Sequence, residues 1–339
     1  STHMRPVGSR SADDNSLSLP RQGDGMMRAE DVARSLSAPP TDSLPPDPGP
    51  PWRTIAEIGQ LPGYSQGLPA ITTGYSALDR VLGGGFRSES TYILAGRTGT
   101  SKSTLALNIA RRVATAQHRV LVFKLEESAT EAVYRLHAAA AQVPFKILID
   151  GVARADPRTE AKLADGWGFI QDLPIFISDV RSLDGIERIA ESHTKTNGEL
   201  IILDQLSMVD VVGFETAYER TTIISNRLRI LARDLRVPIL IVSQVNREAA
   251  KKKRETISAN DLRDSGAIEN DASAVIIIDR VRRPERPEYS GTELTRYLQI
   301  VIPKNRYGPV TEEKPLELLW WPRICRIEDA APEGLADVQ

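Results

Sequence analysis

The sequence predicts an α/β fold with a mostly parallel, doubly wound sheet that ends in antiparallel strands. Short runs rich in β-branched residues recur from residue 92 onward, and stretches of helical periodicity lie between most of them. A strand, a glycine-rich turn and a helix follow one another at residues 92–107, as in phosphate-binding NTPase cores. Residues 314–327 have the pattern of closing antiparallel strands. Together these observations predict one α/β domain with helices on both faces of its sheet.

The expected strands are apolar on both faces, which is typical of a buried parallel sheet. They cover residues 92–95, 120–125, 175–178, 200–203, 238–243, 274–278 and 298–302. The helices expected between them cover residues 103–116, 129–141, 183–194 and 217–235. Ser128 and Glu131 have the spacing of a capping box, in which each side chain accepts a hydrogen bond from a free helical N–H group.

The first 51 residues are expected to form a disordered, proline-rich arm. They hold nine of the 22 prolines and few large apolar side chains, so they cannot bury enough surface to offset chain entropy. The next segment has apolar residues at helical spacing, namely Trp52, Ile55, Ile58 and Leu61. The predicted organisation is therefore an arm at residues 1–51, a linker or docking segment at 52–69, a motor domain at 70–328 and a disordered tail at 329–339.

Composition excludes several classes of protein. No apolar run approaches the roughly 18 residues that a membrane helix needs, and the N-terminal stretch lacks a continuous apolar signal segment, so we expect a soluble, cytoplasmic chain. The single cysteine, Cys325, excludes an internal disulfide framework and a cysteine-cluster zinc site, which favours a reducing compartment. The net charge of −2, with 38 basic and 38 acidic residues after residue 51, excludes a surface coated in basic charge but not local basic patches.

The most informative segment is the glycine-rich turn at residues 96–103. It follows the P-loop pattern except that Ser101 stands where the second glycine belongs, and a Cβ there is expected to strain the loop. In a P-loop, backbone N–H groups hold the phosphates, Lys102 meets the terminal ones and the Ser103 hydroxyl ligates magnesium. An ordinary strand-to-helix turn is the alternative. The predicted nucleotide-binding residues are Gly96, Arg97, Thr98, Gly99, Thr100, Ser101, Lys102, Ser103 and Thr104.

Polar side chains end three of the other expected strands. Asp204 follows an apolar strand, as the Walker B carboxylate that holds Mg²⁺ does, although a carboxylate there can also cap the next turn. Glu126 directly follows another strand and could orient the attacking water, whereas Glu127 is as easily a helix-start charge. Gln244 ends a third strand as a neutral donor that could sense a γ-phosphate. The sequence therefore predicts a metal-dependent nucleotide site at the edge of the sheet where these strands end.

These segments, in this order, resemble the C-terminal RecA-like motor domain of the DnaB-type replicative helicases. Besides the phosphate loop and the strand-end carboxylates, the resemblance includes a Thr-Gly-Tyr-Ser-Ala-Leu-Asp segment at residues 73–79 and a Lys-Asn-Arg-Tyr-Gly-Pro segment at 304–309. Its most specific part is the run at residues 243–272, because other RecA-like families share the phosphate loop but not this run. The resemblance covers about residues 70–328.

The resemblance implies a role for each matching residue. Glu126 corresponds to the catalytic glutamate, Asp204 to the Walker B carboxylate and Gln244 to the γ-phosphate sensor. Lys304 and Arg306 match a pair that reaches the nucleotide of a neighbouring subunit, where a guanidinium stabilises charge on the transferred phosphoryl group. The resemblance further implies ATP and Mg²⁺ as cofactors, a homo-oligomeric ring, which in the family is a hexamer, and 5′ to 3′ movement along single-stranded DNA.

The DNA-binding residues are expected to lie between residues 247 and 266. Arg263, Asp264 and Gly266 match the loop that lines the family's central channel and holds the DNA backbone. A basic cluster at residues 251–254 precedes this loop and either lines a surface that faces DNA or forms a solvated loop. For the later cluster of Arg280, Arg282, Arg283 and Arg286, a solvated loop is favoured. Further predicted DNA contacts are Arg247, Lys252 and Lys253.

DnaB proteins carry a helical N-terminal domain that forms a collar and meets primase, and the proline-rich arm occupies its place here. We therefore expect a truncated or specialised relative, associated with the nucleoid and open to a helicase loader, for which primase docking is unsupported. Two other functions stay open. Residues 82–86 and 126–128 also resemble the RadA and KaiC branches, so a recombination or branch-migration ATPase is one alternative, although those branches lack the run at residues 243–272. Ser101 favours a hydrolysis-poor, nucleotide-gated DNA-binding protein.

Overall fold

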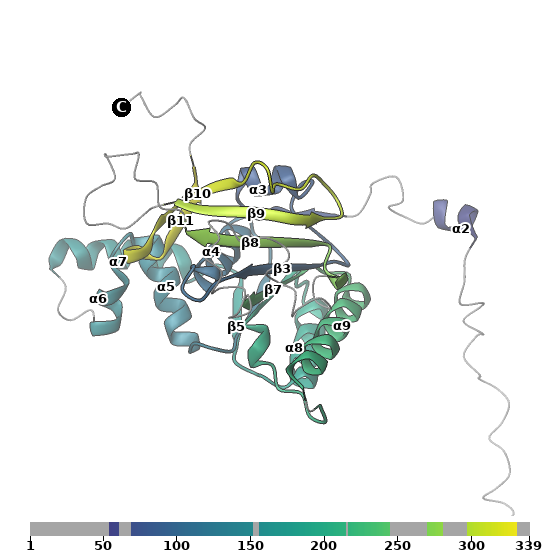
Figure 1. Ribbon diagram of the computed structural model, residues 1–339. Coiled ribbons are helices and arrows are strands. Elements are labelled where there is room, and N and C mark those ends of the chain that lie inside the picture. Colours follow the sequence, from purple (N-terminus) through teal and green to yellow (C-terminus); the bar gives the residue numbers. More distant parts are fainter. Residues whose placement is uncertain are drawn as a thin grey trace, which may run out of the picture. The chain divides into compact units, whose positions relative to one another are not determined.

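The computed structural model describes residues 54–60, 69–151, 156–214, 216–244, 270–280 and 297–330 (Figure 1). The chain divides into two units, Ser1–Leu61 and Pro62–Gln339. In the first unit, the described residues contain α2 (Ile55–Gly59), at whose start the Glu57 amide donates to Thr54 Oγ1 at 3.2 Å. The predicted arm at residues 1–51 lies outside the described residues, as do Trp52 and Leu61 and all but the first two residues of the predicted tail.

The second unit is built on a nine-stranded sheet with the order β11-β10-β9-β8-β3-β7-β6-β4-β5. Its strands are β3 (Thr91–Gly96), β4 (Val120–Lys124), β5 (Ile175–Ser178), β6 (Leu200–Asp204), β7 (Ile239–Gln244), β8 (Ala274–Arg280), β9 (Tyr297–Asn305), β10 (Leu316–Trp321) and β11 (Arg326–Asp329). The six strands from β8 to β5 in this order are parallel, and β9, β10 and β11 continue the sheet antiparallel. The predicted sheet and its antiparallel end are confirmed.

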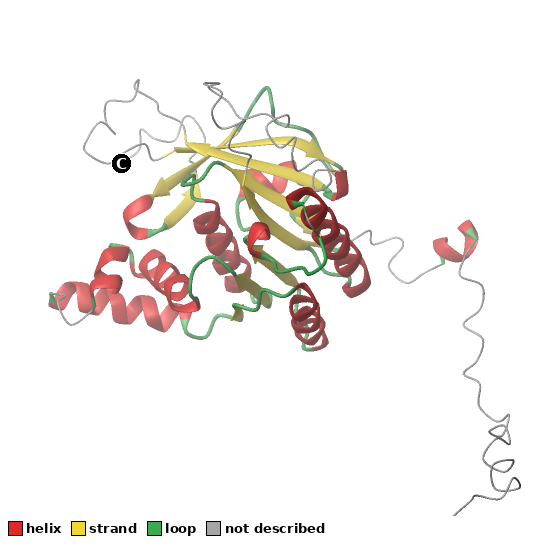
Figure 2. Cartoon of the chain, turned by 60° about the horizontal axis from the view of Figure 1, so that its bottom comes forward, coloured by secondary structure: helices red, strands yellow, loops and turns green. Residues whose placement is uncertain are grey.

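Helices lie on both sides of the sheet (Figure 2). They are α3 (Ser76–Val81), α4 (Lys102–Thr115), α5 (Ala129–Ala141), α6 (Phe145–Asp150), α7 (Pro157–Ile170), α8 (Leu183–Lys195) and α9 (Ala217–Leu235). Two single turns, η3 (Leu206–Met208) and η6 (Pro322–Ile324), and a small sheet of β1 (Ala70–Ile71) and β2 (Phe86–Arg87) complete the described elements. The helices α3, α6 and α7 are additions to those expected from the sequence.

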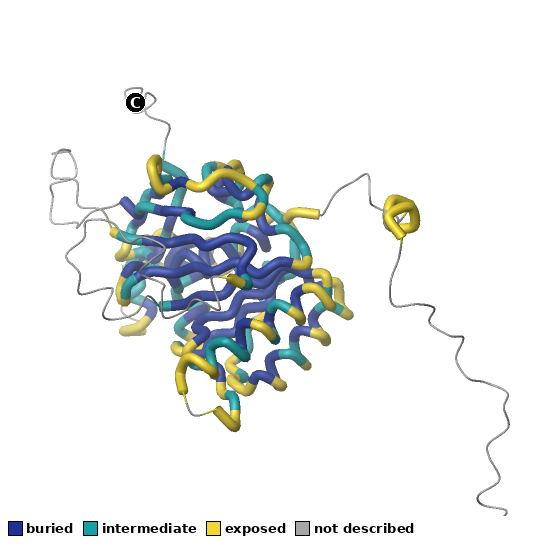
Figure 3. The backbone as a smooth tube through the Cα atoms, turned by 45° about the vertical axis from the view of Figure 1, so that its right-hand side comes forward, coloured by how far each residue is buried: buried dark blue, intermediate teal, exposed yellow. Residues whose placement is uncertain are grey.

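The alternation of side chains along β3 explains why the sheet needs cover on both faces. Tyr92 and Leu94 pack into the core that contains Leu105 of α4, whereas Ile93 packs into the core that contains Leu228 of α9. Every residue of β3 is buried, and the central strands form the buried interior in Figure 3. With β3 central and the loop after it leading into α4, the sheet holds the phosphate loop on a rigid base.

One helix start differs from its prediction and another has a complete cap. Ser128 accepts a hydrogen bond from the Glu131 amide at 3.2 Å, but α5 lacks the return bond from the Glu131 side chain that the capping-box spacing predicts. The full capping box occurs at α9, where Thr216 and Glu219 each accept from the other's amide at 3.1 Å.

Candidate nucleotide site

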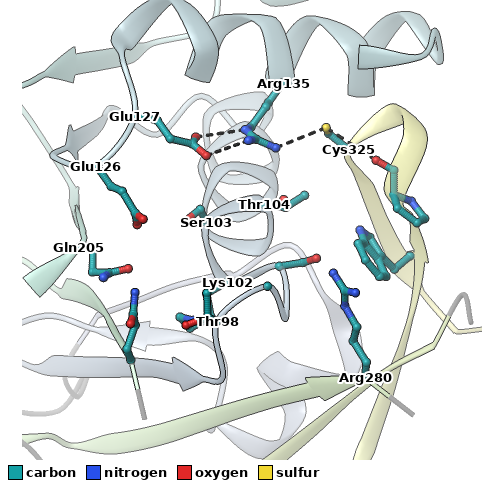
Figure 4. A pocket seen from close by; sticks show the side chains of 15 residues that line it. Thr98, Lys102, Ser103, Thr104, Glu126, Glu127, Arg135, Gln205, Arg280 and Cys325 are labelled. Atoms are coloured by element: carbon teal, nitrogen blue, oxygen red, sulfur yellow. Dashed lines mark hydrogen bonds and ion pairs between the residues drawn. The ribbon is translucent and has the colours of Figure 1, made fainter. Parts of the chain in front are cut away.

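A cavity of about 300 Å³ lies where β3, β4 and β7 end and where η6 approaches them (Figure 4). Parallel strands present their carboxyl ends at one edge of a sheet, which is where α/β proteins bind ligands. The residues that line the cavity are Thr98, Gly99, Ser101, Lys102, Ser103, Thr104, Glu126, Glu127, Arg135, Gln205, Gln244, Arg280, Trp320, Pro322 and Cys325. The site therefore combines the phosphate loop with groups from separate parts of the chain.

The phosphate loop has the backbone that its sequence requires. Ser101 adopts a left-handed conformation with φ of +72°, which supports the expectation that a side chain at this position is strained. Thr100 Oγ1 donates to the Arg97 carbonyl at 2.8 Å and closes the turn. A Cβ on Gly96 would lie 2.4 Å from the Ile278 carbonyl oxygen, so only glycine fits there. The loop thus places Lys102 and Ser103 at the first turn of α4.

The Lys102 ammonium lies within the phosphate loop itself. Its Nζ donates to the carbonyls of Gly96 at 3.0 Å and Arg97 at 2.9 Å. Burial lowers the pKa of Lys102, and the nearby Asp204 and Glu126 carboxylates oppose that effect. The ammonium is therefore held at the loop, where incoming phosphate oxygens can replace the two carbonyls as acceptors.

Ser103 and Asp204 meet at the position expected of a magnesium site. Ser103 Oγ donates to Asp204 Oδ1 at 3.0 Å, although the two residues are 101 positions apart in the sequence. Asp204 is fully buried at the end of β6, and its other carboxylate oxygen accepts from Lys124 Nζ. A hydroxyl and a carboxylate are the hard oxygen ligands that Mg²⁺ prefers, so this pair fits the ion.

The two adjacent glutamates have different surroundings. Glu127 accepts from Arg135 of α5 at 2.7 and 3.1 Å and lies 3.4 Å from Lys124 Nζ. Glu126 points into the cavity in Figure 4, and within the described ranges it forms no hydrogen bond or ion pair. This difference favours Glu126 as the carboxylate available to a water molecule and assigns Glu127 to holding Arg135.

The other predicted catalytic residues are Gln244, Lys304 and Arg306, and the first lies at the opposite end of the strands from the other two. Gln244 ends β7, pairs in register with Gly96 and lines the cavity. Lys304 and Arg306 lie at the far end of β9, where Lys304 Nζ donates to the Asn270 carbonyl at 3.0 Å and the Arg306 amide donates to the Ser273 carbonyl at 2.8 Å. The fold thus brings Gln244 into this chain's own cavity but keeps Lys304 and Arg306 away from it.

The predicted DNA-binding residues all lie outside the part of the chain that the structure describes. They are Arg247, Lys252, Lys253, Arg263, Asp264 and Gly266. Of the later basic cluster, Arg282, Arg283 and Arg286 also lie outside it. Arg280 is exposed, as its solvated interpretation expects, but it belongs to a strand and not to a loop. It ends β8, lines the cavity and holds its guanidinium 4.4 Å from the centre of the Trp320 ring.

Sequence reasoning missed several residues of the site. Lys124 was the detectable one, because a lysine inside an otherwise apolar strand is unusual. Arg135, Gln205, Trp320 and Cys325 lie on elements whose approach to the loop no local pattern reveals. Cys325 Sγ accepts from Arg135 Nη1 at 3.8 Å, which ties η6 to α5 across the cavity mouth (Figure 4).

A phosphate loop before a helix, a buried Asp at the end of a neighbouring strand and a parallel sheet define a P-loop NTPase core of the RecA-like class. Residues 70–329 match the DnaB-like helicase C-terminal domain. The chain belongs to that family.

Curated relatives and solved structures agree with this assignment. The chain is 30% identical over 270 residues to the replicative DNA helicase DnaB of Geobacillus stearothermophilus, covering 76% of this chain and 57% of the relative. It is 29% identical over 284 residues to that of Leifsonia xyli, covering 82% and 60%. The chain thus spans less than two thirds of the length of these relatives.

Two solved structures share the fold. The ATPase domain of G40P superimposes with a TM-score of 0.69 at 21% identity, covering 81% of this chain and 95% of that one. A DnaB-like replicative helicase, described with its interactions with primase, gives a TM-score of 0.70 at 20% identity, covering 79% and 64%. Among the described helices, none is both long and apolar enough to span a bilayer.

Proposed function

We propose that this chain is the ATP-driven motor of a ring-forming DNA helicase that moves along single-stranded DNA. The observation that carries the proposal is that Lys102, Ser103, Glu126 and Gln244 line one cavity, in a chain that belongs to the DnaB-like family. Asp204 is buried next to this cavity and accepts a hydrogen bond from Ser103. A ring, which by the family resemblance is a hexamer, and movement from 5′ to 3′ belong to the same proposal.

In this proposal, each group of the site has a task in ATP hydrolysis. The loop amides and Lys102 bind the phosphates, and Ser103 with Asp204 would hold Mg²⁺, which neutralises charge between the β- and γ-phosphates when bound. Glu126 would accept a hydrogen bond from the attacking water; this role is supported by its carboxylate, which faces the cavity and accepts no hydrogen bond among the described residues. Gln244 would donate to the γ-phosphate from the end of β7.

The register of β8 and β9 supports the action of Arg306 on another copy of the chain. Arg280 at the end of β8 lines this chain's cavity, whereas Ala274 at the start of β8 pairs with Asn305, next to Arg306. The six residue-to-residue steps from Ala274 to Arg280 span about 20 Å at roughly 3.3 Å per residue. That span exceeds the reach of an arginine side chain, so Arg306 would serve a neighbour's nucleotide.

DNA binding is proposed for the residues between β7 and β8. Arg263, Asp264 and Gly266, with Arg247, Lys252 and Lys253, would hold the backbone of single-stranded DNA through charge and backbone amides, without reading its sequence. In the sequence, this segment follows Gln244, the last residue of β7, which lines the cavity. A helicase loader is a further proposed partner, whereas docking of primase is not proposed.

A binding experiment tests the nucleotide site. Lys102→Ala should abolish ATP binding and DNA-stimulated hydrolysis, because it removes the ammonium at the phosphate loop. The matched control is Lys146→Ala, since the Lys146 side chain is 81% exposed and pairs only with Asp150 on the same helix among the described residues. Unchanged ATP affinity in Lys102→Ala would refute the P-loop assignment.

Unwinding of forked DNA tests the motor activity and its direction. Forks that carry only a 5′ or only a 3′ single-stranded tail should be opened from the 5′ tail alone, in an ATP-dependent reaction. Native mass measurement on the same samples should show a hexamer. Strand exchange without unwinding would instead support a recombination ATPase, and nucleotide binding without DNA-stimulated turnover would support a nucleotide-gated DNA-binding protein.

A further inference from the structure

A lysine is buried beside the predicted magnesium ligand. Lys124 is the last residue of β4, and its side chain is completely shielded from solvent. It pairs in register with Asp204 on the adjacent strand β6, so the two side chains leave neighbouring backbones at the same level. Lys124 Nζ bonds Asp204 Oδ2 and lies 3.4 Å from Glu127.

These contacts fix the orientation of the Asp204 carboxylate. One oxygen accepts from Lys124, and the other accepts from Ser103 at 3.0 Å. Because each oxygen has its own donor, the plane of the carboxylate is held and Oδ1 faces the start of α4. Lys124 itself is held by a second anion, Glu127, which in turn binds Arg135 at 2.7 Å.

Because Asp204 is buried, Lys124 compensates the charge of its carboxylate as well as fixing the orientation of that carboxylate. A buried carboxylate without a cation loses its hydration and gains nothing in return, so removing one partner of such a pair is strongly destabilising. Among the described residues, the Lys124 ammonium is the cation in direct contact with Asp204. Lys102, the other ammonium nearby, is bonded to loop carbonyls instead.

We infer that Lys124 is a positioning residue that neutralises Asp204 while the nucleotide site is empty and turns Asp204 Oδ1, the oxygen that accepts from Ser103, toward the metal that accompanies the nucleotide. The inference rests on the proposed function, because it needs Asp204 and Ser103 to hold magnesium. It concerns the state before binding: the internal ammonium allows the metal-binding carboxylate to stay charged and buried without metal.

The variant Lys124→Met tests this role, because methionine keeps much of the length of the side chain and removes its charge. In this variant, Asp204 lacks a cation until a metal arrives, so magnesium should contribute more to nucleotide binding than it does in the wild type. Magnesium should tighten the binding of a fluorescent ADP analogue about tenfold more in Lys124→Met than in the wild type, within the range of couplings measured between contacting residues. The comparison uses titrations with Mg²⁺ and with EDTA.

Thermal unfolding provides a readout that does not depend on nucleotide. Lys124→Met should unfold at a lower temperature than the wild type, and the double variant Lys124→Met/Asp204→Asn should recover part of the loss, because it removes both members of the pair. Lys146→Met is the control for the loss of an ammonium, since its pair with Asp150 is on the surface. This comparison stays decisive if the single variant fails to fold.

The outcomes separate this inference from the proposed function. If magnesium does not tighten ADP binding to the wild type, the metal site of the proposed function is wrong. If magnesium tightens ADP binding by the same factor in the wild type and in Lys124→Met, the inference about Lys124 is wrong. A double variant that is no more stable than Lys124→Met also overturns it, because Asp204 would then not be the group that Lys124 neutralises.

Discussion

Ser101 carries a side chain at a backbone conformation that glycine adopts without penalty. Its φ of +72° lies in the left-handed region, and its hydroxyl makes no capping bond to α4. A residue with a Cβ pays roughly 1–2 kcal/mol for this conformation. The loop therefore keeps its shape because β3 and α4 hold its ends, rather than because its own residues prefer it.

Ser101→Gly should remove this strain and leave nucleotide hydrolysis equal to or higher than in the wild type. Since glycine also gains entropy in the unfolded chain, the expected gain in unfolding free energy is about 1 kcal/mol or less. Steady-state turnover and denaturant unfolding measure both effects. A large loss of turnover would show that the Ser101 hydroxyl has its own task at the phosphates.

Glu126 and Glu127 illustrate what the sequence could not decide. Both follow the same strand, so local pattern alone leaves either as the water-orienting carboxylate. The distinction comes from Arg135, a full two turns into the next helix, which binds Glu127 and leaves Glu126 facing the cavity. The placement of Asp204, in contrast, was predictable, because the carboxyl ends of parallel strands meet at one edge of a sheet, and Asp204 there accepts from Ser103 of the phosphate loop.

At the scale of elements, the strands that pass through the core were predicted, whereas the helices α6 and α7 were not. The apolar runs of β3, β6 and β7 match the expected ranges to within one residue at each end, because burial on both faces requires continuous apolar sequence. The helix α6 has only six residues, four of them apolar, and periodicity cannot distinguish so short a segment from a strand. For α7, the cap at Asp156 followed by Pro157 was a readable start signal.

The capping box of α9 gives a prediction at this scale. Thr216→Ala removes the acceptor for the Glu219 amide and should lower the unfolding free energy by about 1 kcal/mol. Thr222→Ala is the matched control, because its hydroxyl bonds a carbonyl of the same helix, at Tyr218, and alanine favours helix interiors. Urea unfolding of both variants measures the difference. Equal stability of the two would show that the box contributes nothing.

At the scale of the whole molecule, the question is whether two copies of the chain form one nucleotide site. If Arg306 acts on a neighbour, a mixture of inactive Arg306→Ala and inactive Glu126→Ala subunits should regain part of the DNA-stimulated hydrolysis. One kind of junction in such mixed rings joins an intact Glu126 to an intact Arg306. If both residues served the same chain's cavity, every site would lack one of them.

The measurement is ATP turnover across a series of mixing ratios, with each variant alone as the control. Activity that peaks at intermediate ratios is the expected result. A flat line near zero, with native mass measurement showing that mixed rings have formed, would count against action between subunits.

The pairing of β8 with β9 has a consequence for the spacing of sites in such a ring. Backbone hydrogen bonds tie the two strands along most of their length, with Arg280 at one end and Arg306 just past the other. A strand pair inside a nine-stranded sheet does not stretch or fold as a loop does. In the proposed ring, the length of these strands sets the distance between one bound nucleotide and the next. Lengthening both strands by two residues would add about 7 Å to that distance.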